Sequence, residues 1–183
     1  MDAAENGPVG TPQDGPRRLV LLRHAKAEHP DGMSDHVRPL ALNGRRQSGR
    51  VGTALATQDV VPDLVWCSSS VRTRQTWELV RSTLGTTPPV EYLDEVYEAG
   101  VRGLLALVAT APPTVRTLLV VGHEPTMSHA AATLAGPESD DAARARVQVG
   151  VPTASWSLLE LDGEWDDVAP GAARLLQLVT TEH

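Results

Sequence analysis

Residues 19–25 of the 183-residue chain are Leu19-Val20-Leu21-Leu22-Arg23-His24-Ala25, and this stretch decides the fold. Its first four residues are apolar with no polar alternation, which is typical of a strand buried on both faces of a sheet. Two polar side chains follow the strand directly. The stretch therefore predicts a central strand that ends at a polar site.

Apolar strands alternate with amphipathic helices along the rest of the chain. The sequence predicts further strands over residues 63–67 and 117–121, and helices over 43–57, 70–84, 101–108 and 127–134. After a polar loop with some helix over 136–150, two final strands are expected over 155–161 and 174–179 around a turn at Asp162-Gly163. We expect an α/β fold, a three-layer α/β/α sandwich with a mostly parallel central sheet.

Composition sets further bounds. Residues 1–16 are rich in Gly and Pro, so we expect a disordered tail and then a single domain over 17–183. The net charge of −7 argues against nucleic-acid or membrane-surface partners. The one cysteine, Cys67, excludes a disulfide within the chain and a Cys-rich zinc site. No membrane span or signal peptide is visible, so we expect a cytoplasmic protein.

Arginine and histidine side chains follow three of the predicted strands. They are Arg23 and His24 after the first, Arg72 after the second and His123 after the third. Ligands of α/β sheets bind at the carboxyl ends of the strands, and two of these segments lead into helix N-termini, which favour anions. Arginine binds phosphate as a fork, and a neutral histidine can attack phosphorus when its other N–H is held. The pattern predicts a phosphate pocket.

Four segments in order resemble the histidine phosphatase superfamily, which has the phosphoglycerate-mutase-like fold. They are Leu21-Leu22-Arg23-His24-Ala25, the Asp-x-x-Arg-Pro-Leu segment Asp35–Leu40, Ser68–Thr76 and Val120–Pro125. The Asp35–Leu40 segment resembles the bacterial phosphohistidine phosphatase branch. The resemblance implies an enzyme that carries the phosphoryl group on His24, with Arg23, Arg72 and His123 around the phosphoryl oxygens. It implies no metal and no organic cofactor.

Two further roles stay open. Arg38 is a candidate for an extra positive charge at the pocket rim, or else a loop residue paired with Asp35 or Asp31. Ester hydrolysis needs a proton donor, and the resemblance offers Glu95 or Glu98, each of which could equally be a surface carboxylate. A labile phosphorus–nitrogen bond needs this acid less.

Short loops leave little material for a lid, and an open site suits a phosphorylated side chain on another protein. We therefore expect removal of phosphate from phosphohistidine on a protein. The alternatives are a phosphomonoesterase for a small phosphorylated metabolite and a non-catalytic phospho-binding module. A cysteine phosphatase built on Cys67 and Arg72 has the wrong spacing. A metallohydrolase built on His24, His29, Asp31 and His36 lacks a known zinc pattern.

Overall fold

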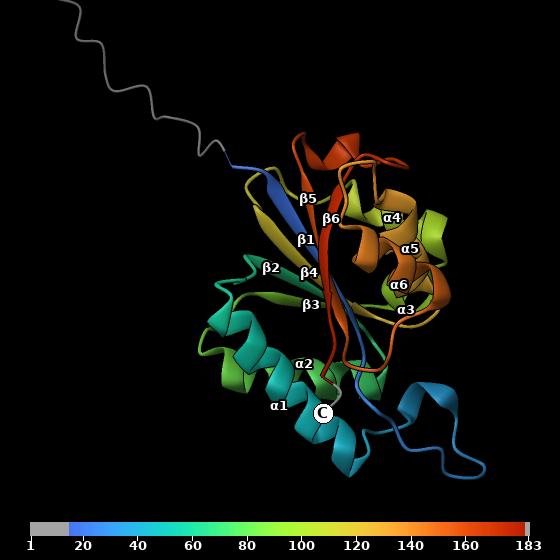
Figure 1. Ribbon diagram of the computed structural model, residues 1–183. Coiled ribbons are helices and arrows are strands. Elements are labelled where there is room, and N and C mark those ends of the chain that lie inside the picture. Colours follow the sequence, from blue (N-terminus) through green and yellow to red (C-terminus); the bar gives the residue numbers. More distant parts are fainter. Residues whose placement is uncertain (1–14, 182–183) are drawn as a thin grey trace, which may run out of the picture.

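The computed structural model describes residues 15–181, which form one six-stranded sheet with helices on both faces (Figure 1). The strands lie in the order β3-β2-β4-β1-β5-β6. Their bounds are β1 Arg17–Arg23, β2 Leu64–Ser68, β3 Val90–Leu93, β4 Thr117–Gly122, β5 Trp156–Leu161 and β6 Arg174–Val179. The first four strands of the sheet order are parallel to one another, and β5 and β6 are antiparallel, which confirms a mostly parallel sheet.

The helices form the outer two layers of the sandwich (Figure 1). One face is covered by α1 (Leu42–Thr57) and α2 (Val71–Leu84), and the other by α3 (Asp94–Glu98), α4 (Val101–Val108), α5 (Thr126–Leu134) and α6 (Asp141–Val149). Side chains alternate across a strand, so Val20 and Leu22 pack toward α1 and α2, while Leu19 and Leu21 pack into the opposite core. Both faces of β1 are therefore buried, as its unbroken apolar run predicts.

The structure adds elements that the sequence pattern does not predict. The edge strand β3 has four residues with mostly exposed or half-buried side chains, and α3 follows it at once. The two strands expected around Asp162-Gly163 are present as β5 and β6, and the chain bends at these residues, but the connection is longer and also contains a short 3-10 helix, η2 (Trp165–Asp167). The expected polar loop with some helix over residues 136–150 is confirmed, because this stretch contains α6, whose N-terminus is capped by the Asp140 carboxylate.

The expected tail over residues 1–16 lies outside the described residues, apart from Gly15 and Pro16. Within residues 15–181, no helix is both long enough and apolar enough to cross a membrane.

The two helices on one face of the sheet approach each other closely at Gly52. A Cβ atom at this position would lie 2.0 Å from Thr83 Oγ1 and 2.2 Å from the Val80 carbonyl oxygen. The same atom at Gly49, one turn earlier, would meet only a methyl group of Thr83 at 3.8 Å. The glycine at position 52 therefore sets the spacing of α1 and α2.

We expect Gly52→Ala to lower the free energy of unfolding by about 1–3 kcal/mol, because the added methyl group forces the helix backbones apart. Gly49→Ala is the matched control. It adds the same methyl group in open space, and alanine favours the helix by up to about 1 kcal/mol, so its stability should be equal or higher. Urea unfolding of both variants checks the prediction, and equal effects at the two positions would contradict it.

Candidate active site

The pairing of β1 with β4 brings two histidines together. The strands are parallel and in a register that places Arg23 opposite Gly122. A histidine directly follows the last residue of each strand. His24 and His123 therefore lie side by side at the same edge of the sheet, and their ring centroids are 5.3 Å apart. The backbone N–H of His24 donates to the Gly122 carbonyl oxygen at 3.0 Å, which fixes this arrangement.

The ring of His24 is held in one tautomer. Its Nδ1 lies 2.8 Å from the Ala25 carbonyl oxygen, which can only accept, so Nδ1 carries the proton. Nε2 is then the unprotonated nitrogen, and His24 lines a pocket at the end of the sheet. Burial lowers the pKa of His24 to about 3, and the charges of Arg72 and Arg23 also lower it, so the ring is neutral near pH 7.

His123 is oriented by one residue on each side of its ring. Arg72 Nη2 donates to Nδ1 at 3.2 Å, which leaves the proton on Nε2, and Nε2 donates to Ser68 Oγ at 2.7 Å. Ser68 ends β2 and Arg72 lies in the first turn of α2, so the second strand end supplies both partners. Burial, followed by the charge of Arg72, lowers the pKa of His123 to about 4.

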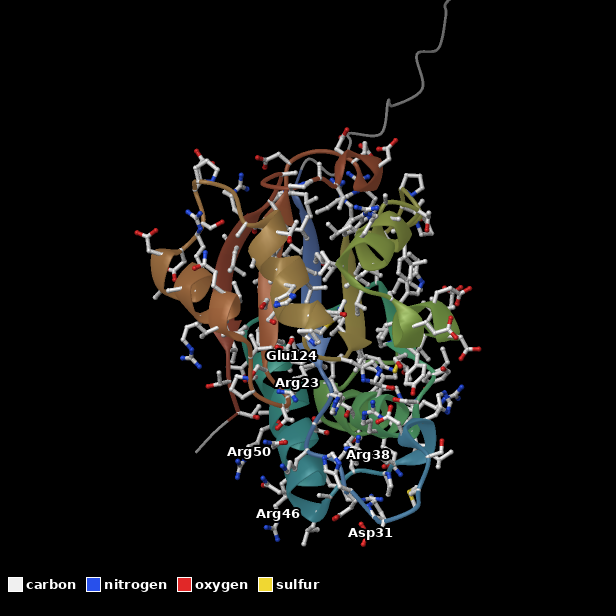
Figure 2. The ribbon with its side chains drawn as sticks, turned by 90° about the vertical axis from the view of Figure 1, so that its right-hand side faces the viewer. Arg23, Asp31, Arg38, Arg46, Arg50 and Glu124 are labelled. Atoms are coloured by element: carbon white, nitrogen blue, oxygen red, sulfur yellow. The ribbon has the colours of Figure 1, made fainter. Side chains whose placement is uncertain are left out.

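Arg23 is anchored to the segment that follows α6. Its Nη1 donates to the Val151 carbonyl oxygen at 2.8 Å. The Glu124 carboxylate accepts from the backbone N–H groups of Val151 at 3.2 Å and Ser128 at 2.8 Å, so it ties this segment to the start of α5. Figure 2 shows Arg23 and Glu124 close together at the ends of the strands.

Asp35 joins the two arginines on the other side of the pocket. Its Oδ1 accepts from Arg38 Nη1 at 2.8 Å, and its Oδ2 accepts from Arg72 Nη2 at 3.0 Å and from the Tyr97 hydroxyl at 2.8 Å. Desolvation opposes ionisation of Asp35, but these three donors outweigh it and hold the pKa of the carboxyl well below its usual range. The Asp35 side chain is therefore a carboxylate.

These groups surround one pocket of about 290 Å³ at the carboxyl ends of the parallel strands. Its lining contains the predicted residues Arg23, His24, Arg38, Arg72 and His123. Arg38 extends toward the pocket from the loop between β1 and α1 (Figure 2). It also pairs with Asp35, so the rim position and the loop ion pair that the sequence left as alternatives are both present.

Glu95 and Glu98 are not brought into this pocket. Both are exposed and border a separate depression on the outside of α3. Their three-residue spacing places them on one helix face, whereas Val96 is buried in the core and Tyr97 reaches Asp35. The carboxylates that line the pocket are Asp35 and Glu124.

Sequence reasoning missed several of the residues in the pocket. Lys26, His29, Asp35, Glu124 and Thr153 line it in addition to the predicted set. A signal existed for two of them, because Asp35 begins the Asp-x-x-Arg-Pro-Leu segment and Glu124 directly follows His123. Thr153 comes from the segment between α6 and β5, and no pattern in the sequence marks it.

The expected role of the α5 N-terminus in anion binding meets a physical obstacle. The Glu124 carboxylate accepts from the Ser128 N–H in the first turn of this helix, so an acceptor from the chain itself already uses that N–H group. In the pocket, positive charge comes instead from the side chains of Arg23, Arg38, Arg72 and Lys26.

The geometry supports neither the cysteine phosphatase nor the metallohydrolase hypothesis. Cys67 is fully buried in β2, and burial raises the pKa of its thiol, so a reactive thiolate is disfavoured. His29 lines the pocket with His24, but its Nε2 is taken up by Arg38 Nη2, and His36 Nε2 contacts Ser69 Oγ. Across residues 15–181, no group of three or more His, Cys, Asp or Glu side chains is placed to hold a metal ion.

Comparison with known proteins identifies the family. The sequence model of the histidine phosphatase superfamily (branch 1) matches residues 19–106. An uncharacterized protein of Mycobacterium tuberculosis is 40% identical over 156 residues, which cover 85% of this chain and 96% of that protein. Phosphohistidine phosphatase SixA of Escherichia coli is 32% identical over 124 residues, covering 67% of this chain and 76% of SixA.

Solved structures show the same relationship. A protein of Nakamurella multipartitia, assigned as a phosphohistidine phosphatase SixA, superposes with a TM-score of 0.78 at 34% identity, over 90% of this chain and 96% of that one. The structure of the protein histidine phosphatase SixA complexed with tungstate gives a TM-score of 0.69 at 25% identity, over 90% and 97% of the two chains. The chain therefore belongs to the histidine phosphatase superfamily, and its sequence and fold are similar to those of the SixA proteins within it.

Proposed function

We propose that this protein removes phosphate from phosphohistidine on another protein, with His24 as the nucleophile and without a metal ion. The observation that carries the proposal is the state of His24. Its Nδ1 is committed to the Ala25 carbonyl oxygen, and burial keeps the ring neutral, so Nε2 offers a lone pair to the pocket. A neutral histidine with its second nitrogen held is suited to nucleophilic attack.

The reaction we infer has two steps. His24 Nε2 forms a bond to phosphorus while the bond from phosphorus to the substrate histidine nitrogen breaks, and that nitrogen keeps the electron pair. With the other ring nitrogen of the substrate protonated, the leaving group is a neutral imidazole. Water then attacks the phosphorus on His24, so that Nε2 regains its electron pair and inorganic phosphate leaves. Arg23, Arg72 and His123 surround His24, and their N–H groups would stabilise the charge on the transferring oxygens.

Two arginines that line the pocket carry a buried donor that no group of the described chain satisfies. The Nε–H groups of Arg23 and Arg72 are buried and have no hydrogen-bond partner among the described residues. Buried donors without acceptors are costly, and phosphoryl oxygens are strong acceptors for guanidinium groups. A phosphoryl group in this pocket would also favour the protonated form of His123, because it offsets the charge of Arg72 that lowers the pKa of this histidine.

The carboxylates of the pocket favour a phosphorus–nitrogen substrate over a phosphate ester. An ester leaving group needs a proton donor, usually a carboxyl group with a raised pKa. Asp35 is held as a carboxylate by three donors, and Glu124 accepts from two backbone N–H groups. In the ligand-free protein Asp35 is therefore ionised and is not in the state of a general acid. An imidazole nitrogen leaves more easily than an alkoxide, so this site suits phosphohistidine.

Replacing the nucleophile should abolish turnover. We expect His24→Ala to lower the rate of phosphate release from a phosphohistidine protein in EDTA by at least about 10³-fold. His129→Ala is the control, because His129 is exposed on α5 and outside the pocket, and it should keep wild-type activity. Retained activity in His24→Ala, or loss of wild-type activity in EDTA, would contradict the mechanism. If the wild type binds inorganic phosphate but releases none from the phosphohistidine protein, the result would favour a non-catalytic phospho-binding module.

Variants of the two glutamates of α3 test whether either of them donates a proton to the leaving group. We expect Glu95→Gln and Glu98→Gln each to change phosphohistidine hydrolysis by less than about twofold, because an exposed carboxylate outside the pocket transfers no proton to the leaving group. Wild-type activity on an aryl phosphate, measured in the same assay, should be weak relative to phosphohistidine. A large loss in either variant would show that this carboxylate reaches the leaving group.

The neutral state of His24 also predicts how stability depends on pH. The pKa of His24 is about 3 in the folded protein, against an ordinary value of 6.5. Between these two values the unfolded chain binds a proton at this histidine and the folded protein does not. Stability is therefore lost as the pH falls. At pH 5 this histidine should account for about 2 kcal/mol of the loss.

Urea unfolding of wild type and His24→Asn at pH 7 and pH 5 measures this effect. The variant lacks the titrating ring, so its free energy of unfolding should fall less than that of the wild type over this range. An equal fall in both proteins would mean that His24 has the same pKa in the folded and the unfolded protein, and would contradict the pKa that burial lowers.

A further inference from the structure

One carboxylate occupies the donors that a phosphoryl group would use. Asp35 bridges Arg38 and Arg72, with one carboxylate oxygen on each guanidinium group, at 2.8 Å and 3.0 Å. The main-chain carbonyl oxygen of the same residue accepts from Arg72 Nη1 at 2.7 Å. Both terminal nitrogens of Arg72 are thus engaged by Asp35, and Arg72 itself is buried.

The arrangement leaves Asp35 free to move while the arginines stay in place. The side chain of Asp35 is 53% exposed, whereas those of Arg72 and Arg38 are 7% and 15% exposed. Arg38 is also held by Nε donating to the Glu28 carbonyl oxygen at 2.9 Å and by Nη2 donating to His29 Nε2 at 2.8 Å. An exposed carboxylate at the start of the short 3-10 helix Asp35–Val37, bridging two buried or half-buried cations, has the chemistry of a bound oxyanion.

We propose that Asp35 is an internal competitor for the phosphoryl site, and that it determines how weakly the pocket holds inorganic phosphate. The inference rests on the phosphatase function proposed above. In the ligand-free protein the carboxylate neutralises Arg38 and Arg72. An incoming phosphoryl group displaces it from Arg72, and after hydrolysis the carboxylate returns and favours the release of phosphate.

Competition of this kind has a clear use at this pocket. Four cationic side chains line it, from Arg23, Lys26, Arg38 and Arg72, and such a set would bind free phosphate tightly. A substrate that is attached to a protein gains binding energy from contacts outside the pocket, but free phosphate does not. Displacing the tethered carboxylate costs the substrate and the product the same free energy, but only the substrate has contacts outside the pocket that offset this cost.

Neutralising Asp35 should strengthen phosphate binding. We expect Asp35→Asn to lower the inhibition constant of inorganic phosphate by about tenfold, since a charge-assisted hydrogen bond is of that order. A purely structural role would have the opposite sign, because loosened arginines bind phosphate less well. The inhibition constant is measured in the phosphohistidine assay and the dissociation constant by titration calorimetry, and thermal melting checks that the variant is folded.

Two further variants sharpen the test. Tyr97→Phe removes one donor to Asp35 at constant charge, so it should also strengthen phosphate binding, by about two- to threefold. Asp31→Asn removes the same charge from the same loop. Asp31 is exposed at the loop tip, further from Arg23 than Arg38 is (Figure 2), and it forms no ion pair within the described part of the chain. Its effect should stay below about twofold, because solvent and salt screen its charge.

The outcomes separate this inference from the proposed function. Tighter phosphate binding in Asp35→Asn and Tyr97→Phe, with no change in Asp31→Asn, supports competition by Asp35. Unchanged or weaker binding in Asp35→Asn overturns it and leaves the phosphatase function standing. A tungstate complex of the wild type in which Asp35 still contacts Arg72 Nη2 also overturns it. A wild type that neither binds phosphate nor hydrolyses phosphohistidine overturns both.

Discussion

The parallel register of β1 on β4 sets the position of the two histidines at the centre of the pocket. With Arg23 opposite Gly122, the next residues of the two strands are His24 and His123, and a backbone hydrogen bond between His24 and Gly122 locks the pair. The pairing of β2 with β4 then places Ser68 beside His123. A shift of one residue would turn each of these side chains to the opposite face of the sheet and remove it from the pocket.

Electrostatics makes this geometry reactive. The chain carries a net charge of −7, yet the pocket gathers Arg23, Arg38 and Arg72 around two histidines that burial keeps neutral. The two carboxylates nearby already accept hydrogen bonds. Glu124 accepts from backbone N–H groups, and Asp35 accepts from two arginines and Tyr97. The result is a site with a neutral nucleophile and cationic donors that can stabilise negative charge, whose two carboxylates are already hydrogen-bonded to other groups of the chain. That combination suits a substrate whose leaving group is nitrogen.

Much of this arrangement could be predicted from the sequence, because local patterns determine it. The apolar runs of β1, β2 and β4 and the polar residues that follow them indicate the sheet, its edge and the set Arg23, His24, Arg72 and His123. Tertiary contacts determine the rest. The direction of Glu95 and Glu98 depends on how the five-residue helix α3 docks through Val96. The roles of Asp35 and Glu124 depend on hydrogen bonds to partners that are distant in the sequence, such as Tyr97 and Val151.

The central claim is that the phosphoryl group passes through His24. The most direct test is to mix the protein with a phosphohistidine protein, stop the reaction in alkali within the first turnover, and locate the phosphoryl group by mass spectrometry of the peptides. We expect a phosphoryl group on His24 that appears before free phosphate and decays as phosphate is released. Turnover with no phosphoryl group on His24, or with the group on another residue of this chain, would contradict it.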